Sequence, residues 1–237
     1  MKIAICDNRI PKNALSELEK YTDKTVLMPP FEALDIPVSA HPDMLIFPAP
    51  EIGVILTHKE YLPKAEKLLK FTGLEIIPIE EAAGRKYPRD ILLNAARIGG
   101  RIFGRLSGLS RSLLDIADKL NLEKIDIKQG YARCSICSVS DSAIITADPS
   151  IEKAAKGCGI DVLSVSQNGV ILPGYDCGFI GGASGTDGEN IFFCGDILSH
   201  PNGETIINFC RKHGKNPISL SNDPLLDIGS IFIIDRC

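Results

Sequence analysis

A strand, helix, strand pattern recurs along this chain of 237 residues at intervals of about 45 residues. One copy begins with GVIL at 53–56, continues through Leu62, Ala65 and Leu69 at helical spacing, and ends in the apolar run LEIIPI. Three further copies begin with RIFG, SAIIT and NIFFC, and a partial copy begins with KIAIC near the N-terminus. A missed repeat would misjudge the whole fold, so this pattern constrains the chain more than any other feature.

Each complete copy is preceded by another apolar stretch, so each unit has two strands, a helix and a third strand. These preceding stretches are DMLIF, DILLNAARI, SICSVS and GFIGGASG. The N-terminal copy lacks its first strand, and SIFIID at 230–235 supplies it. The sequence therefore predicts an α/β fold: a five-bladed pseudo-fivefold α/β propeller in a single domain, residues 1–237, closed by the C-terminal strand. The expected units are about 1–40 with 225–237, then 41–85, 86–130, 131–169 and 170–224.

Two rival folds fit less well. An all-β propeller has a repeat of similar length but no helix in every unit. A doubly wound dinucleotide-binding fold needs a glycine-rich turn after its first strand, and KIAICDNRI has none. No clear helix follows the glycines at 178–185, so we expect them to mark close backbone approach or a bulge rather than a phosphate site.

Composition excludes several partners. Apolar residues make up 44% of the chain, and a net charge of −4 without a basic stripe argues against nucleic acid. No apolar run approaches the roughly 20 residues of a membrane span, and MKIAICDNR turns polar too early for a signal peptide, so we expect no membrane partner and a cytoplasmic location. Eight irregularly spaced cysteines within apolar runs indicate reduced thiols.

Three segments carry a resemblance to a known fold. The stretches DILLNAARIGGRIFGRLSGLSRSLLDIADKL, GYARCSICSVSDSAIITAD and LLDIGSIFI are similar to matching segments of dimethylarginine dimethylaminohydrolases. With the five-unit repeat, the chain resembles the pentein, or guanidino-modifying-enzyme (GME), fold over essentially its whole length, and an uncharacterised bacterial group of that fold. The resemblance implies a cysteine nucleophile on the last strand, a proton-transferring histidine, and acids that bind a guanidinium.

The aligned positions depart from that pattern. The matches are Gly229 or Ile228 with the nucleophile, Ala132 with the histidine, and Phe47 and Pro48 with an acidic pair. Cys237 lies beyond the last strand and out of register with it. We therefore expect the usual catalytic cysteine and histidine, and with them standard hydrolase or deiminase chemistry, to be missing.

The resemblance also implies that ligands bind where the first strands of the units enter the central channel. The equivalent segments here are HPDM, YPRD, YARC, GYDC and LLDI, whose matched residues are Asp43, Asp90, Cys134, Cys177 and Asp227, with Arg89, Arg133 and Asp176 one position earlier. Acids and thiols at one level of a ring could bind a ligand. The alternative is structural, because an aspartate before a strand often caps a turn and an arginine often pairs with a neighbouring acid.

Two enzyme hypotheses follow. Either Cys177 or Cys134 could serve as a relocated nucleophile activated by an arginine, with Asp43 and Asp90 binding a cationic substrate. Alternatively, cysteines and acids could bind a metal, but Cys134 and Cys137 would point to opposite faces of a strand, which argues against chelation. We therefore expect no metal and no cofactor.

The other cysteines and two histidines have simpler interpretations. Cys6, Cys158, Cys194 and Cys210 lie in apolar runs and are expected in the core. His58 and His200 follow the second strands of their units and are expected on the outer surface or as capping residues.

The sequence thus favours a protein that binds a small polar ligand, of guanidino or other cationic type, in the central channel. Its predicted ligand-binding acids are Asp43, Asp90, Asp176 and Asp227. The alternatives are an amidinohydrolase-like or deiminase-like enzyme that uses Cys177 or Cys134, and a non-catalytic scaffold that binds a protein partner through its outer surface. A channel lined with acids and thiols would favour a ligand, whereas an exposed apolar patch would favour a scaffold.

Overall fold

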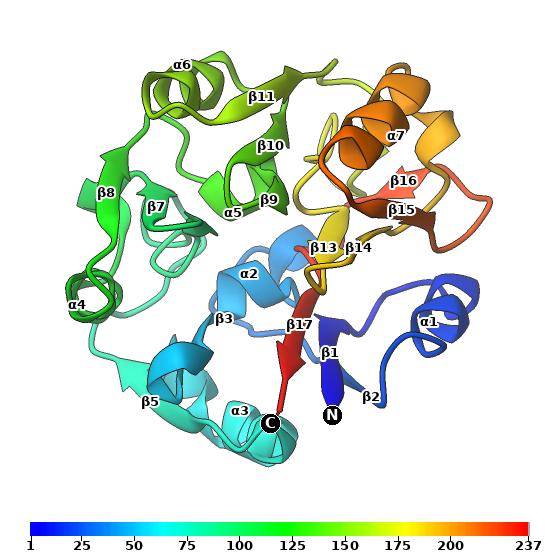
Figure 1. Ribbon diagram of the computed structural model, residues 1–237. Helices are drawn as coiled ribbons and strands as arrows, with labels where there is room; N and C mark the ends of the chain where they lie inside the picture. The colour runs from blue at the N-terminus through cyan, green and yellow to red at the C-terminus, as the bar shows by residue number, and fades with distance from the viewer. Residues whose placement is uncertain (237) are drawn as a thin grey trace.

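The computed structural model describes residues 1–236, which form five three-stranded sheets with the same internal order. In each sheet a central strand pairs antiparallel with an inner strand and parallel with an outer strand. Figure 1 shows the sheets arranged around a common centre, with the inner strands nearest to it. The strand, strand, helix, strand order predicted from the repeat is confirmed in these residues.

The strands lie where the apolar runs predicted them. The inner strands are β17 (Phe232–Asp235), β3 (Ile46–Ala49), β6 (Ala96–Ile98), β9 (Cys137–Ser140) and β13 (Ser184–Thr186). The central strands are β1 (Lys2–Asp7), β4 (Val54–His58), β7 (Arg101–Gly104), β10 (Ala143–Thr146) and β14 (Asn190–Phe193). The outer strands are β2 (Lys24–Met28), β5 (Glu75–Ile79), β8 (Glu123–Asp126), β11 (Asp161–Ser164) and β15 (Asn216–Ser219).

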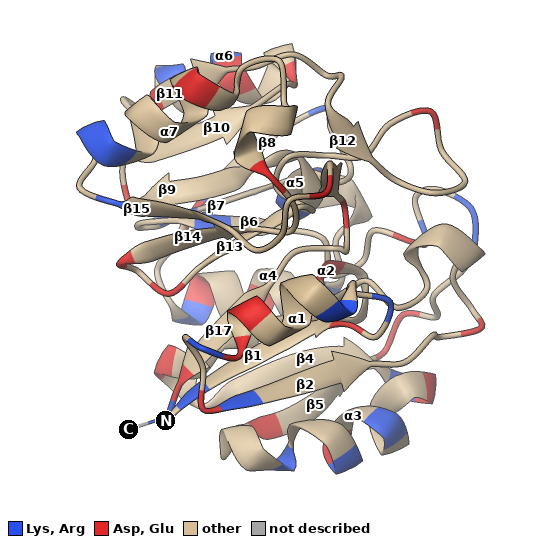
Figure 2. Ribbon diagram, turned by 90° about the vertical axis from the view of Figure 1, so that its right-hand side faces the viewer, with Lys and Arg blue, Asp and Glu red and all other residues tan. Residues whose placement is uncertain are grey.

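One helix connects the central strand to the outer strand in each unit and lies on the outside of the sheets (Figure 1). These helices are α1 (Lys12–Leu18), α3 (Leu62–Leu69), α4 (Arg111–Lys119), α6 (Pro149–Gly157) and α7 (Gly203–Lys212). The start of α6 follows from its sequence, because the Asp148 side chain accepts hydrogen bonds from the backbone N–H groups of Ser150 and Ile151. Their outer faces carry much of the charge (Figure 2), and no helix of residues 1–236 is long and apolar enough to cross a membrane.

The segments that lead into two inner strands are helical turns rather than the predicted strand starts. They form α2 (Pro42–Leu45) and α5 (Ala132–Ser135), each of which ends directly before or near its inner strand. A further two-stranded parallel sheet pairs β12 (Val170–Ile171) with β16 (Leu225–Leu226) before the last strand. These turns redirect polar side chains toward the middle of the molecule, which strands at the same positions would not do.

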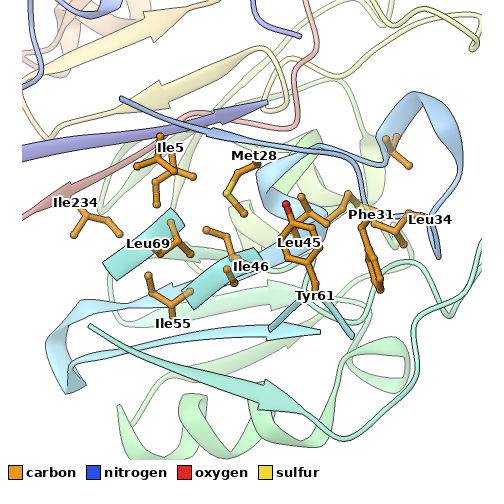
Figure 3. Close-up of a cluster of buried hydrophobic side chains, with 14 of the residues drawn as sticks. Ile5, Met28, Phe31, Leu34, Leu45, Ile46, Ile55, Tyr61, Leu69 and Ile234 are labelled. Atoms are coloured by element: carbon orange, nitrogen blue, oxygen red, sulfur yellow. The ribbon is translucent and has the colours of Figure 1, made fainter. Parts of the chain in front are cut away.

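The C-terminal strand joins the N-terminal one, as the repeat predicted. Ile3 pairs with Ile234, and Ile5 with Phe232, in an antiparallel register. Figure 3 shows the apolar cluster beneath this junction, where side chains from β1, β2, β17 and the second unit pack together. Because fully burying one such aliphatic side chain contributes roughly 1.5–3 kcal/mol, this cluster fixes the last strand against the first.

The surface prediction for two histidines was wrong, although both lie at the ends of short helical turns as the capping alternative expected, and the cysteine prediction holds for three residues of four. His58 and His200 are buried: the His58 Nε2 lies 2.8 Å from the Met44 carbonyl oxygen, and the His200 Nδ1 accepts a hydrogen bond from the Asn202 backbone N–H. One ring nitrogen of each histidine thus pairs with a backbone group inside the fold, and the other has no hydrogen-bond partner in the described residues. Cys6, Cys194 and Cys210 are buried and Cys158 is partly exposed, all as free thiols, whereas Cys237 lies outside the described residues.

Candidate functional site

Polar side chains gather around the amino ends of the inner strands, enclosed within the protein. We call this group the central polar cluster, and its members are each exposed by 4% or less: Asp7, His41, Asp43, Asn94, Cys134, Asp227 and Ser230. They come from β1, from α2 and α5, and from the segments before β6 and β17. Three of them, Asp43, Cys134 and Asp227, are residues that the sequence predicted to share one level of the ring.

Asp43 is the hub of one half of the cluster. Its Oδ2 accepts hydrogen bonds from the Ser230 hydroxyl at 2.8 Å and from the Cys134 thiol at 3.1 Å. Asn94 lies alongside, because its Nδ2 is 3.3 Å from the Asp43 carbonyl oxygen and 3.2 Å from the Cys134 Sγ. The Asp43 Oδ1 has no hydrogen-bond partner among residues 1–236. These contacts connect the last strand to the second, third and fourth units.

His41 lies between two further carboxylates in the other half. Its Nε2 is 3.8 Å from the Asp7 Oδ2 and its Nδ1 is 3.8 Å from the Asp227 Oδ1, too far for hydrogen bonds. Asp7 is held by the Arg9 guanidinium, and Asp227 accepts backbone N–H groups from Phe179 at 2.9 Å and Gly229 at 3.0 Å. The carboxylates therefore have structural partners already.

Burial moves these groups toward their neutral forms. It raises the pKa of Asp227 to about 7, with the nearby Asp43 as the next cause, and it raises the pKa of Asp43 above its ordinary value. It lowers the pKa of His41 to about 3, and it raises the pKa of the Cys134 thiol well above its ordinary value, assisted by Asp43. Cys134 is thus a hydrogen-bond donor in this site rather than an activated thiolate.

Glycines let the backbone close over the cluster. A Cβ on Gly182 would lie 2.0 Å from the Asp227 Oδ1, and one on Gly181 would lie 2.5 Å from the Cys134 carbonyl oxygen. The interpretation of GFIGGASG as close backbone approach is therefore confirmed. A Cβ on Gly229, which has a φ of +67°, would lie 2.1 Å from the Cβ of His41, so the His41 side chain takes the space beside the position aligned with the family nucleophile.

The remaining predicted site residues are not part of this cluster. Asp90 is buried elsewhere and accepts a hydrogen bond from the Tyr131 hydroxyl at 2.5 Å. Arg89 and Asp176 are exposed. Cys177 is partly exposed and lines a separate hollow of about 340 Å³, where the Gln167 side-chain amide lies 3.4 Å from its sulfur. The predicted single ring of acids and thiols is thus divided among the buried cluster, a separate buried position at Asp90 and the outer surface.

The cysteine pair does not form a metal site. Cys134 lies in α5 and Cys137 begins β9, so the two are not on one strand as the sequence suggested. Within residues 1–236 no group of three histidine, cysteine, aspartate or glutamate side chains is placed to hold a metal ion.

A pocket of about 670 Å³ opens toward the carboxyl ends of the inner strands, and we call it the axial pocket. It touches every inner strand, with one representative each in Phe47, Arg97, Ser138, Thr186 and Phe232. Its charged lining residues are Arg97, Arg133, Lys215, Glu51 and Asp141. None of the predicted acids or reactive thiols lines this pocket, so the expectation of an open channel lined by them was wrong.

Arg133 connects the cluster to the axial pocket. Its backbone N–H donates to the Asn94 Oδ1 at 2.8 Å, on the cluster side. Its guanidinium donates from Nη1 to the Ile136 carbonyl oxygen at 3.1 Å and lies 5.4 Å from the centre of the Phe232 ring. The side chain is 9% exposed and forms no ion pair with any described carboxylate. Burial lowers its pKa, while Asp43 opposes that change.

Several pocket residues were not predicted, although the sequence marks them. Arg97 interrupts the apolar stretch DILLNAARI, and Ser138 and Ser140 alternate with Cys137 and Val139 in SICSVS. Polar residues at alternate positions of an otherwise buried strand indicate a face that meets water or a ligand.

Comparison with known proteins identifies the fold. Residues 5–232 match the profile of a family described as "Family of unknown function (DUF6873)". No curated protein sequence matches the chain.

Several solved structures also resemble this chain over most of its length. A Pseudomonas aeruginosa DDAH, a cysteine-to-serine mutant complexed with citrulline, has a TM-score of 0.59 at 11% identity, covering 93% of this chain and 92% of that one. A dimethylarginine dimethylaminohydrolase adduct with 4-chloro-2-hydroxymethylpyridine has a TM-score of 0.58 at 12% identity, with the same coverage. An amidinotransferase from Microseira wollei in the saxitoxin biosynthetic pathway has a TM-score of 0.54 at 14% identity, covering 95% and 93%. These likenesses show an α/β fold of the pentein type.

Proposed function

The chain belongs to the family of unknown function DUF6873, and from its geometry we propose that it binds a small polar ligand in the axial pocket. The observation that carries this proposal is the pocket itself, about 670 Å³ in volume and lined by all five inner strands. Pockets of roughly 300–1,000 Å³ with a few polar groups among apolar ones are typical of small-molecule sites.

The unpaired edges of the inner strands are a reason to expect a polar ligand. Each inner strand pairs along one edge with its central strand, and the one bridge recorded between the other edges in residues 1–236 joins Gly185 to Ile231. Backbone N–H and C=O groups on the other edges need water or a ligand as partner. A small molecule with several donors and acceptors would satisfy them together.

We also propose that the protein lacks the cysteine and histidine chemistry of the guanidino-modifying enzymes. The positions aligned with the nucleophile and the histidine are Gly229 and Ala132, and neither supplies the required group. The central polar cluster is packed, and burial raises the pKa values of Asp43 and Asp227 and lowers that of His41. In the same interpretation the five sheets are one domain, residues 1–237, forming a five-bladed α/β propeller that β17 closes.

A thermal-shift screen tests the proposal. The panel would contain guanidino compounds, citrulline, amino acids, organic acids and phosphate esters. A ligand at about 100 times its Kd adds roughly 2.7 kcal/mol to the free energy of unfolding, which corresponds to several degrees. We expect Ser138→Phe, which fills the pocket, to abolish the shift, and Ser107→Phe, on an exposed turn, to retain it. A shift that persists in Ser138→Phe would reject the pocket as the site.

Thiol labelling separates this proposal from an enzyme with a relocated cysteine. In the native protein we expect Cys177 to react with a maleimide reagent and Cys134 to stay protected, because Cys177 is partly exposed and Cys134 is buried. Rapid labelling of Cys134 that also blocks ligand binding would favour the enzyme. A flat thermal-shift screen of the folded protein would instead favour the scaffold hypothesis.

A further inference from the structure

We propose that the ligand of the axial pocket is a small organic anion and that Arg133 binds its carboxylate or phosphate group. This inference rests on the proposed function of the pocket and adds the chemical class of the ligand. It reverses the charge expected from the sequence, where aspartates were to bind a cation.

The charge of Arg133 is the first argument. Its guanidinium has five N–H donors, and one of them is hydrogen-bonded in residues 1–236, through Nη1 to Ile136. The side chain is nine-tenths buried and no described carboxylate forms an ion pair with it. A buried charge without a partner is costly, so an anion that enters the pocket would gain a partner that the protein itself does not supply.

The position of the Arg133 side chain, between the central polar cluster and the axial pocket, is the second argument. Burial lowers the pKa of Arg133, and Asp43 is the acid that opposes this change. However, Asp43 lies in the central polar cluster and accepts hydrogen bonds from Ser230 and Cys134. Arg133 instead lines the axial pocket beside Phe232. The axial pocket is therefore where an added partner could reach this side chain.

The other charged residues that line the pocket also favour a negatively charged ligand. Arg97 pairs with Glu51 at 2.8 Å, yet its buried Nε has no hydrogen-bond partner in the described residues. Lys215 donates to the Gly188 carbonyl oxygen and adds a third positive group at the rim. Three basic and two acidic side chains line the pocket of a protein whose net charge is −4, so the pocket is more positive than the rest of the molecule.

The lining also defines the rest of the ligand. Phe232 provides apolar surface beside the guanidinium, and Phe47 and Ser138 add an aromatic ring and a hydroxyl to the pocket lining. The planar fork of an arginine matches both carboxylate and phosphate. We therefore expect an anionic head attached to an apolar body, rather than a bare inorganic anion.

Four probes that share a phenyl ring test the charge. Benzoate, phenyl phosphate, benzamide and benzamidine share one ring and differ in the charge of the head group. Isothermal titration with the full chain should show binding of benzoate or phenyl phosphate at least about tenfold tighter than of benzamide, with benzamidine weakest. Preference between the two anions separates a carboxylate ligand from a phosphate ligand, and inorganic phosphate should bind more weakly than either.

Variants at Arg133 assign the effect. Arg133→Met should weaken the binding of the preferred anion at least tenfold, and Arg133→Lys should recover part of it, while Arg211→Met on the exposed face of α7 should leave it unchanged. The inference is overturned if neither anion binds, if benzamide or benzamidine binds as well as benzoate, or if Arg133→Met binds the anion normally. Binding of neutral or cationic probes that Ser138→Phe abolishes would keep the pocket function and reject the anion. Circular dichroism confirms that each variant is folded.

Discussion

The two ends of the inner strands differ although the same five strands form both. At the amino ends the central polar cluster is packed by α2, α5 and the glycines of GFIGGASG, and none of its residues is more than 4% exposed. At the carboxyl ends the strands enclose an axial pocket of about 670 Å³. The difference lies in the connecting segments, which fill one end and leave the other open. A repeated fold therefore does not by itself decide which end holds a ligand.

The two ends also differ in charge. The cluster holds three carboxyl groups whose partners are internal, with Asp227 and Asp43 shifted toward their neutral forms by burial. The pocket holds Arg133, which forms no ion pair with a carboxylate of the described chain. Acids in a packed interior act as hydrogen-bond acceptors of the fold, whereas a cation at the floor of an open pocket can act on a ligand.

The largest effect should come from one methyl group at the filled end. Gly182→Ala would place its Cβ about 2 Å from the Asp227 carboxylate oxygen, so the backbone over the cluster must move. We expect a loss of about 3 kcal/mol in the free energy of unfolding, measured by urea denaturation.

Gly100→Ala is the matched control for this substitution. A Cβ on Gly100 meets no atom within 4 Å, so we expect a change within about 0.5 kcal/mol. Equal stabilities of the two variants would show that the cluster has room for an added group. The contrast between the two ends of the inner strands would then be weaker.

The second prediction concerns Asp227→Asn, which should change how the free energy of unfolding depends on pH. The native pKa of Asp227, about 7, exceeds its ordinary value of 3.8, so its contribution to stability is present below pH 3.8 and is lost as the pH rises to 7. Asp227→Asn removes that loss. Relative to wild type, its free energy of unfolding should therefore rise as the pH increases from 4 to 7, measured by urea denaturation.

His41→Gln provides the control of opposite sign. The native pKa of His41, about 3, lies below its ordinary value of 6.5, so wild type loses stability as the pH falls from 6.5 toward 3. Relative to wild type, His41→Gln should become more stable as the pH falls through that range. If both variants follow the wild-type profile, the two groups are solvated in the native protein and the cluster is not closed.

The repeat made the architecture predictable, because periodic apolar runs report which faces of strands and helices are buried. The pairing of SIFIID with KIAIC followed from the strand missing in the N-terminal copy, and the meaning of the glycines at 178–185 could be inferred from the local sequence. The position of the site could not. HPDM and YARC fold as helical turns, and the placement of Asp43 and Cys134 inside the protein depends on contacts with Ser230 and Asn94 from distant segments.

The smallest effect should come from the rim of the open end. Glu51 pairs with Arg97 at 2.8 Å, half-exposed, so Glu51→Gln should change the free energy of unfolding by less than about 1 kcal/mol. It removes a negative charge from the pocket and frees Arg97, so the affinity for benzoate or phenyl phosphate should rise roughly two- to threefold at low salt, and less at high salt. Titration calorimetry at two salt concentrations measures this change, with Glu66→Gln on the exposed face of α3 as the control. An affinity that falls, or that rises equally in Glu66→Gln, would mean that the rim does not sense the charge of the ligand, and the contrast between the two ends would then rest on Arg133 alone.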